Sequence, residues 1–332
     1  LLCLVIAVSF AVLAKSGDWL VDEAVALSER SGISKTVIGA TIVSLGTTTP
    51  ETAVSVMAAI QGSPGLALGN AVGSIICDTG LILGLACLIA PLKLDPRVTG
   101  RQGWIQIGSA VALVLACLPW HDPLSAFTTG GRLPQFAGFL FLGALVVYIV
   151  KSIQWARADA VEPALDEHER DVAAPFPLIL LRLITAVALV VVSARVLIPA
   201  AAELAHRLSV PDSIIAATLV AFGTSLPELI TAVSAARRGH GELAVGNIVG
   251  ADILNVLFVS GAAVAVTPAG LFAGAYFFRV LFPIMTGILV VFRLGVIYSG
   301  DFLRRPFGFV LLGAYALNLL VSYLLPAGRG TM

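Results

Sequence analysis

Charge is scarce in this chain, since only 12% of its 332 residues are charged, about half of the fraction found in soluble domains. The 20 basic and 20 acidic residues balance, so net charge favours neither nucleic acid nor an acidic surface as a partner. Cysteine and histidine are rare, with four of each. They form no CxxC pair and no HExxH motif, and no GxSxG element accompanies them. We therefore predict no enzyme activity, no cofactor and no disulfide framework.

Apolar residues make up 58% of the chain, and they fall in runs long enough to cross about 30 Å of hydrocarbon as helices. The opening segment LLCLVIAVSFAVLA has no basic n-region, which indicates a membrane helix and not a signal peptide. We predict an all-α membrane protein with ten transmembrane helices. The expected spans are 1–30, 34–60, 64–92, 101–119, 134–153, 175–207, 211–236, 241–268, 271–292 and 306–326.

One long polar stretch, residues 156–174, divides the chain into halves 1–155 and 175–332 with five expected helices each. Basic residues indicate the orientation, because they gather on the cytoplasmic side of membrane proteins. With both termini outside, the inner side holds Arg30, Lys35, Lys93, Arg97, Arg101, Lys151, Arg157, Arg170, Arg237, Arg238, Arg293, Arg304 and Arg305, and the outer side Arg132, Arg207 and Arg329. We expect a multi-pass protein of the inner or plasma membrane with a cytoplasmic linker and no obligate protein partner.

The two halves repeat one another at an offset of 177 residues. Residues 38–51 (IGATIVSLGTTTPE) match 215–228 (IAATLVAFGTSLPE), and residues 68–74 (LGNAVGS) match 245–251 (VGNIVGA) in the same register. Five helices is an odd number, so the second half would enter the membrane from the opposite side. Inverted repeats of this kind are typical of secondary transporters, whose site lies at the repeat interface near the bilayer midplane.

The first shared motif, Gly-Thr-x-x-Pro-Glu, lies in the middle of an apolar span in each half. Its proline removes a backbone hydrogen bond and frees the carbonyl four residues earlier, which cannot face lipid. Glu51 and Glu228 follow these breaks, and a carboxylate at that depth needs a cation or a proton. Hydroxyl groups beside the breaks supply neutral oxygen ligands. They belong to Thr47, Thr48, Thr224 and Ser225.

The second shared motif, Gly-Asn-x-x-Gly, lies in the following span. Its glycines allow close helix crossing, and we expect Asn70 and Asn247 to bind the loosened backbone or reach the cavity. One turn later, Ser74 and Asp78 share a helix face, so Asp78 can join Glu51 and Glu228 in one cage. The second half has Asp252 and Asn255 in this region.

Three carboxylates surrounded by neutral oxygens suit Ca²⁺, which takes six to eight oxygen ligands. No histidine or thiolate pair accompanies them, which disfavours soft transition metals, and Mg²⁺ dehydrates reluctantly. Without a cation the carboxylates would repel one another. This charge requirement favours exchange of Ca²⁺ for another cation.

At these motifs the chain resembles the cation/calcium exchanger superfamily, specifically its prokaryotic sodium/calcium exchangers. The paired motifs carry the resemblance, here residues 46–51 with 69–74 and 223–228 with 246–251, and it covers essentially the whole chain. It implies alternating access by sliding of the first and sixth helices, and exchange of Ca²⁺ for Na⁺ with Glu51 and Glu228 as central ligands. The further ligands that it implies are Thr47, Thr48, Ser74, Thr224, Ser225 and the backbone carbonyls of Ser44 and Ala221.

Several positions depart from the family pattern. Asp78 stands where the family often has asparagine, Asn255 where it often has aspartate, and Asp252 where asparagine is common. Ala251 replaces a serine that would bind sodium. Alternatives therefore stay open: a Ca²⁺ antiporter that uses H⁺ or also takes K⁺, and, from another class, a cation channel.

Overall fold

The computed structural model describes residues 2–158, 174–208 and 223–324, and these are almost entirely helical. The first half contains α1 (Leu2–Ser31), α2 (Lys35–Ile38), η1 (Gly39–Val43), α3 (Ser44–Thr47), α4 (Thr49–Ile60), α5 (Pro64–Ile76), η2 (Cys77–Ile82), α6 (Leu83–Ile89), α7 (Pro96–Cys117), η3 (Pro123–Phe127) and α8 (Gln135–Ala158). The second contains α10 (Phe176–Arg207), α13 (Leu226–Arg237), α14 (Gly241–Leu254), η5 (Asn255–Ser260), α15 (Gly261–Ala265), η6 (Phe277–Leu281), α16 (Phe282–Ser299) and α17 (Arg305–Leu324). Four short strands complete the list: β1 (Leu92–Lys93), β2 (Gly131–Leu133), β3 (Leu271–Ala273) and β4 (Phe302–Leu303).

Seven helical segments within the described ranges are long and apolar enough to cross a membrane. They are Leu2–Ser31, Pro64–Ile89, Gln135–Ala158, Phe176–Arg207, Gly241–Ala265, Phe277–Ser299 and Arg305–Ser322. Two of the predicted spans are described but are not among these seven segments. The span 34–60 is divided into shorter helices, and the span 101–119 belongs to α7, which carries Arg97 and Arg101 in its first turns. Much of the predicted span 211–236, like most of the predicted linker 156–174, lies outside the described residues.

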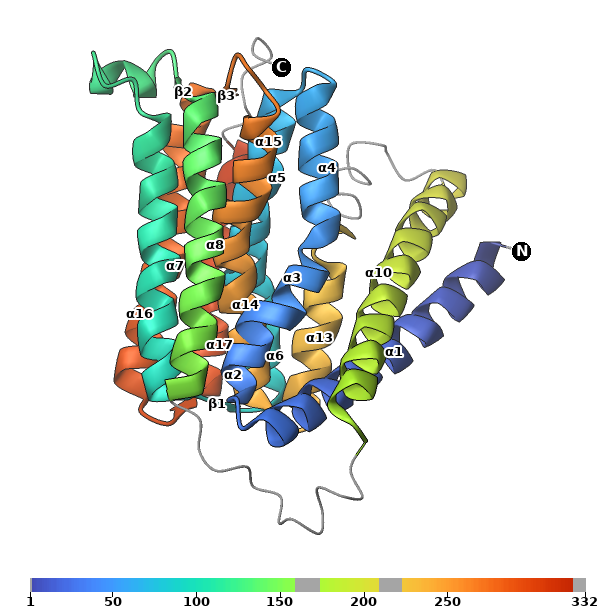
Figure 1. The fold of residues 1–332 in the computed structure, drawn as a ribbon. Coiled ribbons are helices and arrows are strands. Elements are labelled where there is room, and N and C mark those ends of the chain that lie inside the picture. Colours follow the sequence, from blue (N-terminus) through green and yellow to red (C-terminus); the bar gives the residue numbers. More distant parts are fainter. Residues whose placement is uncertain (1, 159–173, 209–222, 325–332) are drawn as a thin grey trace.

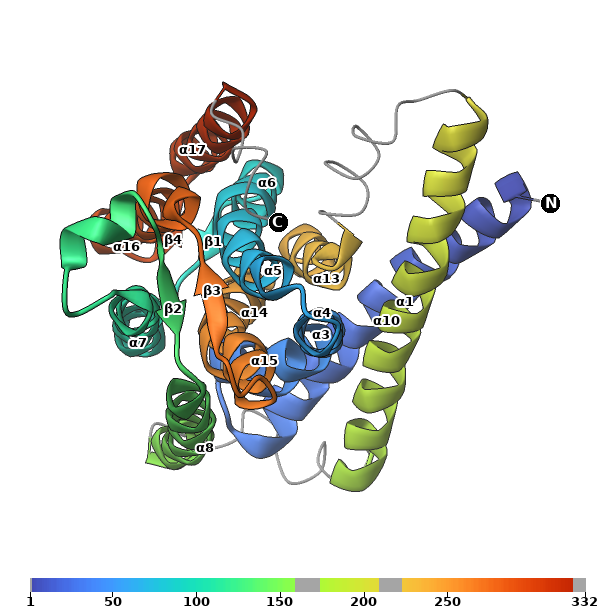
Figure 2. The same ribbon diagram turned by 90° about the horizontal axis from the view of Figure 1, so that it is seen from above.

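Helices α1 and α10 form a pair that is inclined to the other helices (Figures 1 and 2). They make the most extensive contact between any two described elements, and α1 also packs on α13. The remaining helices form a bundle in which α14 and the two segments that follow it are surrounded by α2, η1, α4, α7 and α8. A residue on α14 is therefore buried on all sides, which is why nearly the whole of this helix is inaccessible.

The two small strand pairs each join one half of the chain to the other. Strand β1 pairs antiparallel with β4, and β2 pairs antiparallel with β3. Figure 1 shows β2 and β3 at the top of the molecule and β1 at the bottom. Strands β1 and β3 follow corresponding helices of the two halves, so equivalent strands lie at opposite ends.

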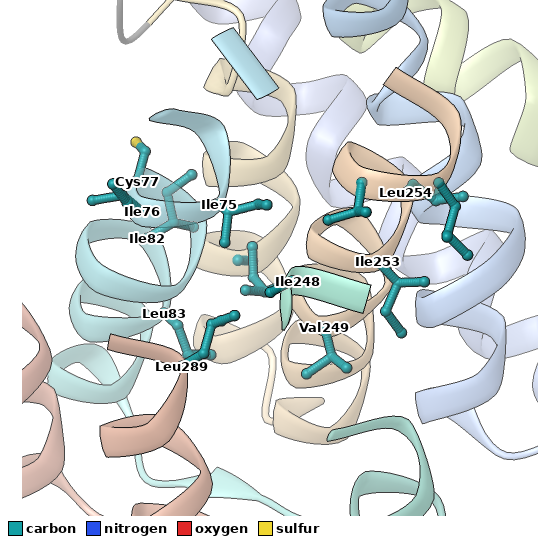
Figure 3. Close-up of a cluster of buried hydrophobic side chains, with 14 of the residues drawn as sticks. Ile75, Ile76, Cys77, Ile82, Leu83, Ile248, Val249, Ile253, Leu254 and Leu289 are labelled. Atoms are coloured by element: carbon teal, nitrogen blue, oxygen red, sulfur yellow. The ribbon is translucent and has the colours of Figure 1, made fainter. Parts of the chain in front are cut away.

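The hydrophobic core lies where the second and third helical segments of each half meet. Figure 3 shows Ile75, Ile76, Ile82 and Leu83 on one side, with Ile248, Val249, Ile253 and Leu254 of α14 on the other. A second face of α14 crosses α2 and η1 of the first half closely, because α14 carries glycine there. A Cβ added at Gly246 would lie 2.2 Å from the Thr36 carbonyl oxygen, and one at Gly250 would lie 2.5 Å from that of Ala40.

The predicted close glycine contact is thus present for the Gly-Asn-x-x-Gly motif of the second half. Its partner is the interrupted helix α2–η1 of the first half. The copy of this motif in the first half differs. Among the described residues, a Cβ at Gly69 would meet only Phe277, at 3.8 Å. By the 177-residue offset, the helix segment that would contact Gly69 in the same way is 213–217, the counterpart of 36–40. It lies outside the described ranges.

The predicted helix break occurs in the first half at Thr48, which separates α3 from α4 with ψ −4°. The π-helical segments η1, η2 and η5 were not predicted. Asp78 lies in η2, and η5 begins at Asn255. The prediction for the ninth span was wrong at its start. Residues 271–273 form β3 after Gly270, which has φ +72°, and the helical segments run from Phe277 to Ser299.

Candidate functional site

Four acidic side chains are buried in the bundle: Glu51 on α4, Asp78 on η2, Glu228 on α13 and Asp252 on α14. Each is only 1% exposed. None forms an ion pair with a basic side chain of the described residues, although Arg195 attracts Glu51 at longer range. Glu51, Asp78 and Glu228 lie close enough to repel one another when ionised. Buried charge of one sign therefore accumulates between the two halves.

Glu51 and Glu228 occupy matching positions, each in the first turn of its helix and directly after proline. Proline is tolerated in the first turn because its missing N–H would have no helical acceptor there. The positive end of the helix dipole favours a carboxylate in the same turn. The Pro-Glu pair thus begins a helix and places an acidic group at its electropositive end.

Hydrogen bonds across the halves connect the predicted ligands. Thr48 Oγ1 donates to Glu228 Oε1 at 3.3 Å, and Asn255 Nδ2 donates to Asp78 Oδ2 at 3.4 Å. Two further contacts join the Gly-Thr-x-x-Pro-Glu motif of the second half to the Gly-Asn-x-x-Gly motif of the first half. They are Thr224 Oγ1 to Asn70 Oδ1 at 3.4 Å and Ser225 Oγ to Ser74 Oγ at 3.5 Å. Residues from both copies of the repeat are therefore joined by hydrogen bonds between the halves.

Several buried oxygen atoms of this site have no hydrogen-bond partner among the described residues. They are both carboxylate oxygens of Glu51, Oε2 of Glu228, Oδ1 of Asp78 and Oδ1 of Asn255. A buried charge without a partner costs several kcal/mol. Such oxygens are suited to bind a hard cation or, for the carboxylates, a proton.

The three carboxylates of the predicted cage, Glu51, Asp78 and Glu228, are buried and repel one another. Among the residues that the structure describes, no three acidic, histidine or cysteine side chains converge closely enough to hold one metal ion. Like charges repel, so bare carboxylates gain nothing from closer approach. A cation bound here would need neutral oxygens as well, and Thr47 and Thr48 are fully buried beside the acidic groups.

The remaining predicted residues occupy different surroundings. Asn70 Nδ2 donates to the Glu51 carbonyl at 3.3 Å and to Ser55 Oγ at 3.0 Å, so it supports the backbone at the start of α4. Asn247 is fully buried and its amide has no partner among the described residues. The carbonyl of Ser44 accepts from the Thr48 amide at 2.8 Å and from Thr47 Oγ1 at 3.3 Å. Ala221 lies outside the described residues.

Asp252 has neutral donors that the sequence analysis missed. Its Oδ2 accepts from Gln106 Nε2 at 2.6 Å and from the Thr79 hydroxyl. Gln106 is 1% exposed and lies on α7 one turn after Gln102, which bonds Tyr148 Oη at 2.9 Å. Two glutamines four residues apart in an apolar span were the available signal. They share a helix face, and that face meets the acidic centre.

Replacing Gln106 by leucine should destabilise the protein by about 1–3 kcal/mol, because a buried carboxylate loses a charge-assisted donor. Thermal unfolding in detergent measures this loss. The double variant Gln106→Leu/Asp252→Asn should recover much of it, since the uncompensated charge is then removed. Equal stability of Gln106→Leu and the parent chain would show that this hydrogen bond contributes nothing.

The fold and site define a multi-pass helical membrane protein whose buried acidic groups form no ion pair within the described residues. Residues 1–154 and 178–324 match the family described as sodium/calcium exchanger protein, and the chain belongs to this family.

Relatives resemble the chain along nearly its whole length. The sodium/calcium exchanger MaX1 of Methanosarcina acetivorans is 29% identical over 96% of this chain and 98% of its own. The inner membrane protein YrbG of Escherichia coli is 31% identical over 93% and 92%. The solved structure of the sodium-calcium exchanger NCX_Mj superposes with a TM-score of 0.78 at 25% identity, covering 95% of this chain and 97% of that one.

Proposed function

We propose that this chain is a secondary antiporter that exchanges Ca²⁺ for Na⁺ by alternating access at one carboxylate site near the bilayer midplane. The observation that carries the proposal is the pair Glu51 and Glu228. Both are buried, both follow a proline in the first turn of a helix, and neither pairs with a basic side chain of the described residues. Membership of the sodium/calcium exchanger family supports the choice of ions.

In this proposal Glu51, Glu228 and Asp78 provide the charge that binds the cations. Hydroxyl, amide and carbonyl oxygens complete the coordination and distinguish Na⁺ from Ca²⁺. The proposed neutral ligands are Thr47, Thr48, Ser74, Thr224, Ser225, Asn255 and the carbonyls of Ser44 and Ala221. Asn70 and Asn247 position the helices. Asp252 lies beside the site, where Thr79 and Gln106 donate hydrogen bonds to it.

We further propose that the chain comprises ten transmembrane helices in two inverted repeats, 1–155 and 175–332, with both termini outside and the linker 156–174 cytoplasmic. The placement of equivalent strands at opposite ends supports this inversion (Figure 1). The hydrogen bond between Asn255 and Asp78, which are equivalent positions 177 residues apart, agrees with a pseudo-twofold axis through the site.

A calcium/proton antiporter is the second candidate, because one sodium ligand of the family pattern is absent. Position 251 is a fully buried alanine, so it offers no hydroxyl oxygen. Relative to the family pattern, aspartate and asparagine have changed places at positions 78 and 255, so the number of carboxylates is the same. Asp78 and Asn255 are hydrogen-bonded to one another. Calcium binding is therefore expected under either mechanism, and only the counter-ion differs.

Calcium uptake into proteoliposomes tests the proposal. Vesicles loaded with Na⁺ should accumulate Ca²⁺, whereas vesicles loaded with K⁺ or choline at equal pH should not. A pH gradient without sodium should drive uptake only if the proton alternative is correct. Uptake that needs no counter-ion on the opposite side would contradict exchange and favour a channel.

A further inference from the structure

A charged chamber of about 810 Å³ opens at the end of the bundle where α1 ends and α2 and α7 begin. Its walls are the turn between α1 and α2, strand β1 with the start of α7, the first residues of α14, and the turn before β4. Its volume is within the range of ligand-binding pockets, about 300–1,000 Å³. It is separate from the carboxylate site, since none of the four buried acidic groups lines it.

Two cationic groups in this chamber have no carboxylate partner among the described residues. Lys35 Nζ lies 3.2 Å from His240 Nδ1. Burial, and then the charge of Lys35, lower the pKa of His240, and an imidazole carries no negative charge that could neutralise the ammonium group. The side chain of Arg97 forms no hydrogen bond or ion pair with the described residues, while Lys93 pairs with Glu242 at 3.7 Å.

Thr36 and four acidic residues line the same chamber. The hydroxyl of Thr36 and Oε2 of Glu242 are buried and make no hydrogen bond to the described residues. Glu29, Asp95 and Asp301 are the other acidic lining residues. Asp95 accepts hydrogen bonds from the first backbone amides of α7, whereas Glu29 and Asp301 form no ion pair within the described ranges. A ligand suited to this chamber therefore carries both an anionic and a cationic group.

An apolar groove of about 160 Å³ adjoins the chamber. The two cavities share Ile33, Val37 and Ala156 as lining residues. The groove continues between α8 and the segment α2–η1 as far as Leu45 and contains almost no polar surface apart from the Tyr148 and Thr41 side chains. Its outer residues are open to the surroundings of the bundle, since Leu45 is 38% exposed. A chain of methylene groups fits such a groove, at about 0.8 kcal/mol for each buried CH₂.

We propose that the chamber and the groove together bind one membrane phospholipid whose headgroup carries a phosphate and a primary ammonium, as in phosphatidylethanolamine. The phosphate would lie near Lys35 and Arg97, the ammonium near Glu29 and Asp301, and one acyl chain along the groove. The headgroup of a purely anionic lipid would be repelled by the two carboxylates, because it has no cationic group to pair with them. A soluble phosphate compound would leave the groove without an occupant.

The bound lipid would stabilise the segment that leads to the ion site. Its acyl chain would pack on Thr41 and Leu45, which flank Ser44 within one turn on either side. The Tyr148 hydroxyl at the same groove already bonds the carbonyl of Ala40 at 3.1 Å. Exchange activity should therefore be higher in bilayers that contain this lipid, although binding itself does not depend on the transported ion.

Native mass spectrometry of the purified, delipidated full chain tests the proposal. Phosphatidylethanolamine should be retained more strongly than phosphatidylcholine, whose quaternary ammonium cannot donate hydrogen bonds, and than phosphatidylglycerol. Glycerophosphoethanolamine, the headgroup without tails, and inorganic phosphate should bind far more weakly. Arg97→Gln should weaken retention about tenfold, because one charge-assisted hydrogen bond is lost, and Arg304→Gln, outside the chamber, should not.

A second pair of variants tests the groove independently of charge. Ile153 lines the groove and Val150, on the same helix, does not, and their exposed fractions are 44% and 45%. Ile153→Trp should fill the groove and reduce retention, whereas Val150→Trp should leave it unchanged. Equal retention by all variants would show annular lipid only. Tight binding of the headgroup alone, or strongest binding of phosphatidylglycerol, would also overturn the proposal.

Discussion

Glu51→Gln and Glu228→Gln should each reduce sodium-driven calcium uptake by about 100-fold or more. Loss of one partner from a buried charge pair costs about 3–5 kcal/mol, and each 1.4 kcal/mol is a factor of ten. Both glutamates are 1% exposed, and three of their four carboxylate oxygens have no hydrogen-bond partner among the described residues. The neutral amide keeps the shape of the side chain, but it removes the charge and replaces one carboxylate oxygen by an NH2 group that cannot bind a cation. Uptake of ⁴⁵Ca into sodium-loaded proteoliposomes measures the effect.

The stability of the same variants separates a ligand role from a folding role. Removing one of several mutually repelling carboxylates should leave thermal stability without calcium unchanged or higher, while stabilisation by added calcium should disappear. Glu203→Gln is the matched control, because Glu203 is exposed and pairs with Arg207 at 2.8 Å. Normal uptake by either site variant would remove that glutamate from the proposed ligands and, with it, the single midplane site.

Gly246→Ala should lower the free energy of unfolding by about 1–3 kcal/mol, or prevent folding altogether. The added methyl would lie 2.2 Å from the Thr36 carbonyl oxygen, and this backbone atom belongs to a helix that cannot rotate away as a side chain would. To relieve the contact, α14 must move away from α2. Thermal unfolding in detergent, with the yield of monodisperse protein, measures the loss.

Gly143→Ala is the control for helix propensity. Gly143 lies within α8, and an added Cβ would meet nothing within 4 Å, so alanine should stabilise the helix by up to about 1 kcal/mol. The two substitutions make the same chemical change with opposite expected signs. If Gly246→Ala is as stable as the parent chain, the close crossing of the two halves is not required for the fold.

The parts of the site that could be predicted are those that one stretch of sequence defines. The pattern Gly-Thr-x-x-Pro-Glu occurs twice in register, and each proline begins a helix with its glutamate in the first turn. The start of the ninth helix could not be predicted, because β3 forms only when the distant strand β2 is available to pair with it. The π-helical turn at Asp78 likewise depends on packing, since π-helices have no strong local sequence signal.

Gln106 shows most clearly where the prediction failed. It lies in an apolar span that carries neither repeated motif, and its role follows from α7 passing beside η2 and α14 so that its amide reaches Asp252. Asp252 was assigned to the ligand set, which stays a prediction: its Oδ2 accepts from Gln106 and Thr79, whereas its Oδ1 has no partner among the described residues. Position along the chain does not tell which face of α14 meets α7.

By itself the sequence determined that the chain enters a membrane, that its halves are duplicates, and that two acidic residues follow helix-starting prolines. These properties depend on local hydropathy, on spacing and on the chemistry of single residues. Only the tertiary structure decided that the partner of each motif lies in the opposite half, that Gly246 crosses against Thr36, and that a charged chamber joins an apolar groove. Such contacts join residues that are far apart along the chain, and the packing of helices against one another determines them.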